Sequence, residues 1–374
     1  MPRILIAPDS FKGTLTAREV CEITGRAFKN TIENCEITAL PLADGGEGLC
    51  ACLEKIRGGR FVTAEVPGVF GERIQARYLM LDDGTAVIET ASVAGLPLAG
   101  DRKNPETATT KGLGTLIRHA EKSDAKRILL GLGGSATNDC GAGMASVLGY
   151  EFYGESGIID CPAGKDLGRI THIKPPAEKV KIPVVCACDV DNPLYGENGA
   201  AYVFAPQKGA DEEMVKRLDS GLRNTAEVMK KDLGADVADM PGAGAAGGLG
   251  AGTVVFLGAK LQRGIDLVLD YGGFADKAAQ ADLVITGEGR LDSQSLQGKV
   301  ISGVARRCVP LGKKLIAICG CAGDGWEEAL ESGVSAAYFS CNEPKPFDEV
   351  IKTCREDLYA AALKAAKEIR EGAV

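Results

Sequence analysis

Short apolar runs that lead into polar, glycine-bearing turns and then into helical patterns constrain the fold of this chain most. Residues 3–7 (RILIA) form such a run, and residues 16–19 (TARE) carry the capping-box pattern of a helix start. The same order returns near the C-terminal end, where apolar runs occupy residues 283–286, 315–319 and 336–340. Because strands that alternate with helices form parallel sheets, these two parts of the sequence predict a doubly wound α/β domain.

The middle of the chain follows a different pattern. Residues 61–90 hold three strand-like runs separated by glycine and aspartate turns without helices between them, which predicts a hairpin-rich mixed sheet. An amphipathic helix is expected from Asp211 to Leu233. A length of 374 residues is typical of two domains. We therefore expect a Rossmann-like or flavodoxin-like domain of residues 1–60 and 275–374, an inserted mixed α/β domain of residues 61–274, and a ligand site in the cleft.

Charge and composition argue against several kinds of partner. The formal net charge is −8, whereas nucleic acids and anionic membranes are bound by basic surfaces. Residues 242–259 are uncharged over a length that can span a bilayer, but seven of them are glycine, so we expect a glycine-rich loop and a short buried segment. The thirteen cysteines lack zinc-site spacings, which favours buried thiols in a reducing compartment. We expect a cytoplasmic protein without nucleic-acid or membrane partners, and the sequence leaves homo-oligomers open.

Two polar loops follow the first two predicted strands. The first, DSFKGT, contains Asp9, Ser10 and Lys12, and its lysine is suited to a phosphate, the alternative being a solvated turn. The second, ADGGEG, opens a helix, and its Asp44 suits a divalent metal or a substrate hydroxyl, or else caps that helix. Loops at the carboxyl ends of strands in a doubly wound sheet form the ligand crevice, so both loops are predicted to line it.

A third loop, GLGGSATND at residues 131–139, matches the loose G-x-G-x-x-A dinucleotide pattern. Its side chains are more polar than a pyrophosphate loop needs, and they indicate nucleotide phosphates or Mg²⁺. Lys208, in the segment FAPQKGA, is either a phosphate contact or a merely solvated lysine. The predicted nucleotide-binding residues are Gly133, Gly134, Ser135, Thr137, Asn138 and Lys208.

A pair of acids follows the buried run VVCA. Asp189 and Asp191 are one residue apart, and this spacing at a strand exit fits a base and a metal ligand for phosphoryl transfer. The alternative is an Asx turn before Pro193.

The stretch LVITGEGRLDSQSLQGKV combines charges of both signs with three glycines. Glu288 and Asp292 can bind a metal or a polyol, while Arg290 and Lys299 can neutralise a carboxylate or a phosphate. A surface ion-pair network would use the same charges but would not require the glycines. A small polyhydroxy acid beside a phosphate donor would use every residue type present.

Seven segments, in this order, carry a family resemblance: APDSFKGTLTA, PLADGGEG, GLGGSATND, DVDNPLYG, FAPQKGA, PGAGAAGGLG and TGEGRLDSQSLQGKV. Together they closely resemble bacterial glycerate kinases of the glycerate/glyoxylate-catabolic type, over nearly the whole chain. The resemblance implies ATP-dependent phosphorylation of D-glycerate with Mg²⁺, usually on the 2-hydroxyl to give 2-phosphoglycerate. It also implies two α/β domains, one inserted into the other.

On this basis the candidate residues receive roles as a hypothesis. Arg290, with Lys12, holds the glycerate carboxylate, and the other substrate-binding residues are Ser10, Asp9 and Glu288. Asp189 is the first choice to face the reacting hydroxyl and Asp44 the second, Lys299 or Lys208 offsets charge on the phosphoryl group, and Asp292 and Asp191 hold the metal.

The sequence departs from the family pattern at a few positions. Cys140 follows Asn138 and Asp139 where glycine is expected, and this cysteine is expected to reshape the helix start. Asp191 stands where a small hydroxyl residue is frequent, and VISGVA replaces VPIGVA after Lys299. The alternatives are a kinase for another small hydroxy acid, a non-catalytic sugar-acid sensor on the same scaffold, and a nicotinamide dehydrogenase suggested by the glycine pattern alone.

Overall fold

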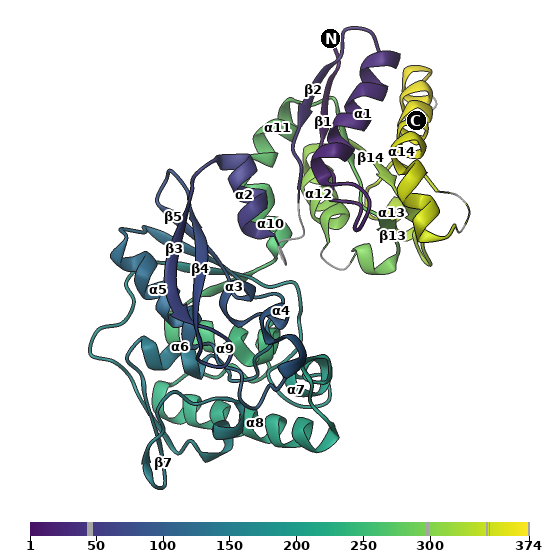
Figure 1. The fold of residues 1–374 in the computed structure, drawn as a ribbon. Coiled ribbons are helices and arrows are strands. Elements are labelled where there is room, and N and C mark those ends of the chain that lie inside the picture. Colours follow the sequence, from purple (N-terminus) through teal and green to yellow (C-terminus); the bar gives the residue numbers. More distant parts are fainter. Residues whose placement is uncertain (43–47, 297–298, 342, 344, 373–374) are drawn as a thin grey trace. The chain divides into compact units, whose positions relative to one another are not determined.

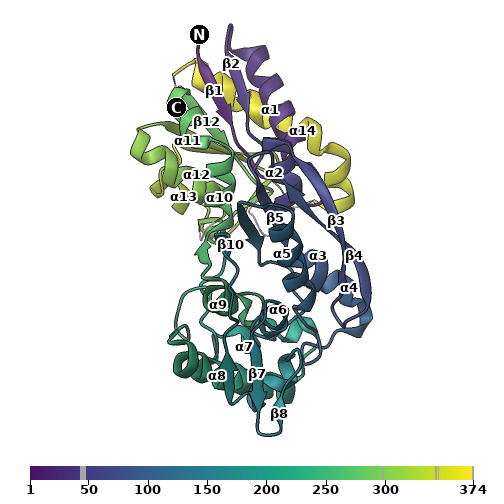
Figure 2. The same cartoon turned by 90° about the vertical axis from the view of Figure 1, so that its left-hand side faces the viewer.

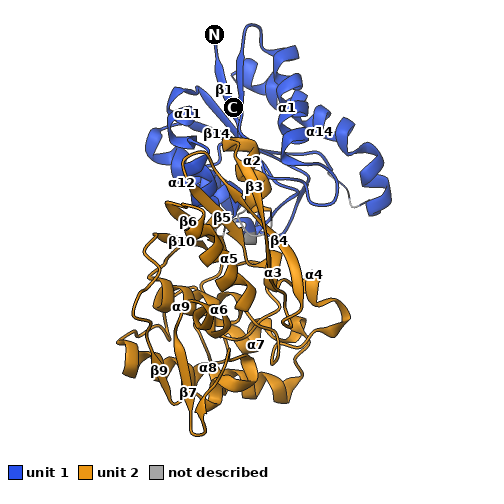
Figure 3. Ribbon diagram, turned by 60° about the vertical axis from the view of Figure 1, so that its left-hand side comes forward, with its two compact units in different colours: residues 1–44, 265–374 blue, residues 45–264 orange. Residues whose placement is uncertain are grey.

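The computed structural model describes residues 1–42, 48–296, 299–341, 343 and 345–372. Contacts divide the chain into two compact units, unit 1 with Met1–Asp44 and Ile265–Val374, and unit 2 with Gly45–Gly264 (Figure 3). The predicted α/β class is confirmed, with a parallel sheet in one unit and a mixed sheet in the other.

The unit boundaries fall at 44/45 and 264/265 and not near the expected positions 60 and 275. The reason at the first boundary is α2 (Leu49–Arg57), which packs against β4 and β5 of unit 2. The Oε1 atom of Glu89 accepts hydrogen bonds from the Gly48 and Leu49 backbone N–H groups at 2.8 and 2.9 Å, and so fixes the start of this helix. At the second boundary, the segment after residue 264 packs on unit 1, where Gly303 contacts Ile265.

Unit 1 is built on a five-stranded parallel sheet of order β16-β14-β12-β1-β2. The strands are β1 (Arg3–Ile6), β2 (Glu36–Ala39), β12 (Leu283–Thr286), β14 (Lys314–Cys319) and β16 (Ala336–Phe339). The chain runs from β1 to β2 in one direction and from β12 through β14 to β16 in the other. The order therefore reverses between β1 and β12, and ligands of such sheets bind beyond the carboxyl ends of the strands at this point.

Helices cover both faces of this sheet. On one face α1 (Ala17–Thr31) and α14 (Phe347–Arg370) lie side by side, and they bury Ile4, Ile6 and Phe28 between them and the strands (Figure 1). Figure 2 shows other helices of this unit on the opposite side of the strands. The remaining elements are α10 (Gly264–Tyr271), α11 (Phe274–Gln280), β13 (Arg290–Leu291), η4 (Ser293–Leu296), α12 (Val300–Cys308), η5 (Val309–Leu311), β15 (Cys321–Ala322) and α13 (Glu328–Glu331).

Unit 2 holds a six-stranded mixed sheet of order β11-β10-β6-β5-β4-β3. Its strands are β3 (Arg60–Pro67), β4 (Arg73–Met80), β5 (Thr85–Glu89), β6 (Arg127–Gly131), β10 (Val184–Ala187) and β11 (Lys260–Gln262). β3, β4 and β5 pair antiparallel, which confirms the predicted hairpin-rich region, and β5, β6, β10 and β11 run parallel. A small sheet of order β8-β7-β9 is formed by β7 (Glu151–Gly154), β8 (Gly157–Ile158) and β9 (His172–Lys174).

The helices of unit 2 include the predicted amphipathic helix, α8 (Glu212–Leu233). The Asp211 side chain accepts a hydrogen bond from Met214 N–H at its start, and Gly234 ends it in a left-handed conformation. The capping box at Thr16 and Glu19 of unit 1 is likewise present. The other helices of unit 2 are α3 (Ala91–Ala94), α4 (Leu96–Ala99), η1 (Gly100–Arg102), α5 (Lys111–Lys122), α6 (Ala142–Val147), η2 (Gly164–Arg169), α7 (Ala200–Phe204), η3 (Pro206–Lys208) and α9 (Ala245–Leu257).

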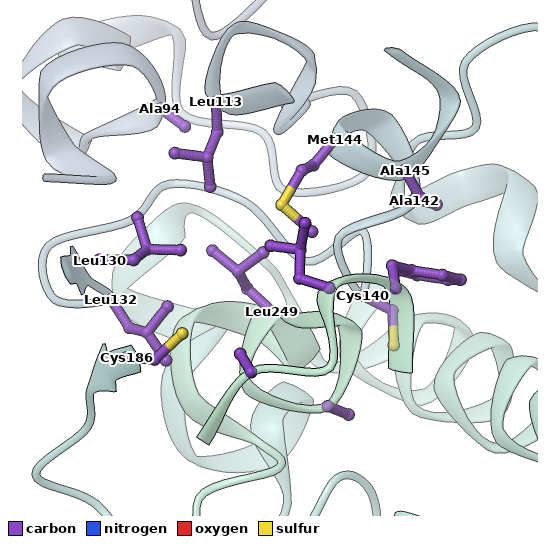
Figure 4. Packing of buried hydrophobic residues seen from close by; sticks show 14 of the residues in the cluster. Ala94, Leu113, Leu130, Leu132, Cys140, Ala142, Met144, Ala145, Cys186 and Leu249 are labelled. Carbon is purple, nitrogen blue, oxygen red and sulfur yellow. The ribbon is translucent and has the colours of Figure 1, made fainter. Parts of the chain in front are cut away.

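The glycine-rich segment packs backbone against backbone inside unit 2. A Cβ atom on Gly247 would overlap the carbonyl oxygen of Thr137, and one on Gly252 would overlap that of Cys140. The Cys140 N–H donates to the Gly247 carbonyl at 3.1 Å, and Cys140 lies with Leu249 in one buried cluster (Figure 4). Among the described residues, no helix is both long and apolar enough to cross a bilayer.

Candidate functional site

A cavity of about 690 Å³ lies within unit 1 at the carboxyl ends of β1, β12, β14 and β16. Its position at the reversal of strand order is where a parallel doubly wound sheet is expected to bind its ligand. The structure brings six of the predicted site residues together around it: Asp9, Ser10, Lys12, Glu288, Arg290 and Lys299. Their individual roles stay predictions.

The loop after β1 is held against the loop after β12. Asp9 donates its backbone N–H to the Gly287 carbonyl at 2.8 Å, and its own side chain is only 7% exposed. The Oδ1 atom of Asp9 accepts hydrogen bonds from the Ser10 N–H at 2.6 Å and from the Ser10 hydroxyl at 3.3 Å. Lys12 follows in an exposed turn. The two loops thus form one surface, although they lie at opposite ends of the sequence.

Glu288 is the most deeply buried acid of this cavity. It is 6% exposed, and its Oε1 atom has no hydrogen-bond partner in the part of the chain that the structure describes. Burial raises the pKa of Glu288 to about 7, the Ser295 hydroxyl and Lys299 act in the opposite direction, and the neighbouring charges of Asp9 and Asp292 raise the pKa further. A carboxyl group in this position titrates near neutral pH.

Arg290 is positioned by a compact turn. Its Nε atom lies 3.5 Å from Oδ2 of Asp292, and its side chain is 61% exposed. Ser295 fixes the turn, because its hydroxyl donates to the Arg290 carbonyl at 3.1 Å and its N–H donates to Oδ1 of Asp292 at 3.0 Å. Arg290 therefore presents a guanidinium group to the cavity with much of its surface still solvated.

The apolar part of the cavity lining was not predicted from the sequence. It includes the side chains of Phe339, Phe347 and Val350 and the thiols Cys321 and Cys341. Phe339 packs edge-on against Trp326 with the ring centroids 5.1 Å apart. Their positions in the sequence could have indicated that Cys321 and Cys341 line the cavity. They follow the carboxyl ends of β14 and β16, as Glu288 follows the carboxyl end of β12.

The loop at residues 131–139 is used inside unit 2. The buried Lys208 Nζ donates to the Thr137 carbonyl at 2.8 Å and to the Ser135 hydroxyl at 3.2 Å, so the alternative of a merely solvated lysine is wrong. Burial lowers the pKa of Lys208 to about 7, against the opposing effect of Asp139. Ser135, Thr137 and Asn138 are also buried, whereas Gly133 and Gly134 are partly exposed. Nucleotide binding by this group stays a prediction.

Asp139 organises that loop, although it was not among the predicted nucleotide-binding residues. Its fully buried carboxylate accepts hydrogen bonds from the N–H and the hydroxyl of Thr110, both at 2.8 Å, and from the Gly141 N–H at 3.1 Å. The buried position raises the pKa of Asp139, while these donors oppose the change. The glycine-rich pattern before Asp139 favoured phosphate binding by this loop. In the structure, the Asp139 carboxylate joins the loop to Thr110 at the start of α5.

The acids after β10 are exposed. Asp189 accepts a hydrogen bond from the Gly264 N–H at 2.8 Å, and Asp191 lies 3.6 Å from the Arg263 guanidinium. Asp44, the second choice for the reacting acid, lies outside the described residues. Within the described ranges, no group of three or more His, Cys, Asp or Glu residues is arranged to hold a metal ion.

Comparison with known proteins identifies the family. Residues 4–370 match the model of the Glycerate kinase family. The chain is 42% identical to a glycerate kinase of Bacillus cereus, with 97% of each chain covered, and 39% identical to the glycerate 2-kinase of Escherichia coli, with 99% and 98% covered. A crystal structure from Salmonella typhimurium, of a protein assigned as glycerate kinase 2, superposes with a TM-score of 0.86 at 37% identity over 99% of both chains. This chain is therefore a kinase that belongs to the glycerate kinase family.

Proposed function

We propose that this protein transfers the γ-phosphoryl group of ATP to a hydroxyl of D-glycerate and that the product is 2-phosphoglycerate. The observation that carries the proposal is the cavity at the strand-order reversal of unit 1, where Lys12, Arg290 and Lys299 meet the acids Asp9 and Glu288. Such a set offers cations for a carboxylate and for phosphate oxygens, and acids for hydroxyl groups. Family membership sets aside the nicotinamide dehydrogenase alternative.

The cavity fits a small hydroxy acid together with part of a larger donor. We assign the glycerate carboxylate to Arg290 and Lys12, and the glycerate hydroxyls to Ser10, Asp9 and Glu288. A volume of about 690 Å³ lies in the range of pockets for ligands much larger than glycerate. The same cavity therefore leaves room for the donor phosphates, and we assign the offsetting of their charge to Lys299.

The acids of the chain also suit Mg²⁺. This ion is commonly bound by one or two protein carboxylates together with substrate phosphates, so a kinase does not need a cluster of protein ligands. Asp292 of unit 1 is the carboxylate assigned to it, and its side chain is partly exposed. When bound, Mg²⁺ neutralises charge on the transferred phosphoryl group.

Phosphorus NMR of the product formed from D-glycerate and ATP tests the proposal. A phosphate on the 2-hydroxyl is coupled to one carbon-bound proton and gives a doublet, whereas a phosphate on the 3-hydroxyl is coupled to two and gives a triplet. We expect a doublet that grows with the ADP signals. A triplet would correct the position of transfer, and no phosphate ester would contradict the function. Tartronate and threonate in parallel samples test for a kinase of another hydroxy acid.

Replacement of Arg290 tests where glycerate binds. Arg290→Ala is expected to raise KM for glycerate at least about tenfold, because a hydrogen bond to a charged group is worth about 1.5–3 kcal/mol. Arg306→Ala is the matched control, since Arg306 is paired with Asp266 in the same unit and does not line the cavity. If KM for ATP rises instead, Arg290 binds the phosphoryl donor and the assignment is reversed.

A further inference from the structure

Glu288 occupies a position that the fold alone does not require. Its side chain is almost completely buried, yet its Oε1 atom has no partner among the described residues. Burial of a carboxylate oxygen without a hydrogen bond disfavours the folded state, so buried polar groups are almost always paired. Glu288 also lines the cavity. A carboxyl group with an unpaired oxygen at the wall of a cavity indicates a group held ready for a ligand.

The backbone around Glu288 is tightly fixed. Gly287 precedes it, and a Cβ atom at Gly287 would overlap the Ile318 carbonyl of β14. Gly289 follows it, and a Cβ atom there would lie 3.3 Å from the Cα atom of Phe11. The Gly320 N–H donates to the Glu288 carbonyl at 3.0 Å. Glu288 is thus clamped between β14 and the loop after β1, at the reversal of strand order.

We infer that Glu288 is the general base that takes the proton from the reacting hydroxyl of glycerate, an inference that rests on the proposed function. The O–H bond of the hydroxyl breaks, and its proton passes to the Glu288 carboxylate. The hydroxyl oxygen forms a bond to the γ-phosphorus, and the bond from that phosphorus to the bridging oxygen of ADP breaks. Glu288 then releases the proton to solvent, so glycerate and ATP give phosphoglycerate, ADP and one proton.

The surroundings of Glu288 suit this role. Charged or titratable groups from the neighbouring elements face the Glu288 carboxyl group. They are Asp9 after β1, Asp292 after β13, Lys299 at the start of α12 and the Cys319 thiol of β14. Their combined effect with burial gives a pKa of about 7, and a base is most effective when its pKa lies near the working pH. Asp189, the acid favoured from the sequence, is exposed and accepts a hydrogen bond from Gly264 N–H.

Single-turnover kinetics of Glu288→Gln, Asp189→Asn and the unchanged protein test the inference. Glu288→Gln is expected to lower the transfer rate at least about 100-fold with KM for glycerate changed less than about threefold, and Glu288→Asp to recover part of the rate. In the unchanged protein, the transfer rate should rise with pH as the Glu288 carboxyl ionises and then level off, and this inflection should be absent in Glu288→Gln. Glu331→Gln is the matched control, because Glu331 is an exposed glutamate of the same unit that does not line the cavity.

These experiments distinguish a failure of the proposed function from a failure of the role inferred for Glu288. If the unchanged protein does not phosphorylate glycerate, the proposed function fails. If it does, but Glu288→Gln keeps its rate within about threefold or keeps the same inflection while Asp189→Asn loses both, then only the role of Glu288 is overturned. Should Glu288→Gln fail to fold, the rate and pH profile of Glu288→Asp decide, since a shorter carboxylate must change both if it is the base.

Discussion

Glu288 is expected to lower the stability of the folded protein at neutral and alkaline pH. In the unfolded chain its carboxyl ionises near its usual pKa of 4.5, whereas in the folded chain the pKa is about 7. As pH rises, the unfolded state therefore loses this proton at a lower pH than the folded state does. The free energy of unfolding falls as pH rises from about 4.5 to about 7. Glu288→Gln should be more stable than the unchanged protein by roughly 2–3 kcal/mol at pH 8.

Urea unfolding of both proteins at pH 8 and at pH 4 measures this difference. The gain should disappear at pH 4, where the glutamate is protonated in both states. Equal stability at pH 8 would show that the carboxylate has a partner and would remove the basis for an elevated pKa. A variant that gains stability while it loses activity is the behaviour expected of a functional residue held in an unfavourable environment.

Cys140 adopts a backbone conformation that is unfavourable for any residue with a Cβ atom. Its φ angle is 52°, in the left-handed region, and its side chain is fully buried. Cys140→Ala removes the thiol but keeps the strain, whereas Cys140→Gly removes both. We expect the glycine variant to be more stable than the alanine variant by about 1 kcal/mol in urea unfolding, because glycine avoids the left-handed penalty. An alanine variant as stable as the glycine variant would contradict the strain.

At the scale of elements, the glycine-rich start of α9 depends on close backbone contact. Gly247 and Gly258 both have positive φ angles, of 70° and 63°. A Cβ atom at Gly247 would overlap the Thr137 carbonyl oxygen, but one at Gly258 would meet no atom of the described residues within 4 Å. Gly258→Ala is therefore expected to cost about 1 kcal/mol of unfolding free energy, and Gly247→Ala more than about 3 kcal/mol.

Thermal and urea unfolding of the Gly247 and Gly258 variants measure the two costs. Because both substitutions carry the same backbone penalty, their difference reports the steric overlap alone. Similar values would mean that α9 can move away from the 137–140 loop at little cost. In that case, the glycines of this segment would need another explanation, such as contact with a ligand.

At the scale of the whole molecule, each unit has its own hydrophobic core. One buried cluster belongs to unit 2 and a separate one to unit 1. Residues 45–264 form one continuous segment, so a fragment of this segment should fold by itself and unfold cooperatively. Residues 1–44 alone should stay unfolded, since β1 pairs with β12 from the other end of the chain.

Far-UV circular dichroism and urea unfolding of the two fragments check this expectation. A single cooperative transition of the 45–264 fragment is the expected result. A gradual loss of signal without a transition would show that the inserted segment needs unit 1 in order to fold, and that the two cores are not independent.

Local sequence patterns were enough to predict the class of the fold and many element limits. Strand and helix signals are local. An apolar period extends over a few neighbouring residues, and each of the capping residues Thr16 and Asp211 acts on the first turn of its own helix. The seven ordered segments also indicated the family. The end of unit 1's first segment was misplaced, because α2 has an ordinary helical pattern and only its packing on β4 and β5 assigns it to unit 2.

Which strands are neighbours and which polar groups are buried became known from the three-dimensional fold. The pairing of β1 with β12 brings Asp9 to Glu288, and no periodicity in the sequence specifies such a partner. The same holds for Lys208, which composition cannot distinguish from a surface lysine until the 131–139 loop encloses it. Burial arises from contacts between distant segments, and it is burial that shifts the pKa of Glu288 into the range where a carboxylate can act as a base.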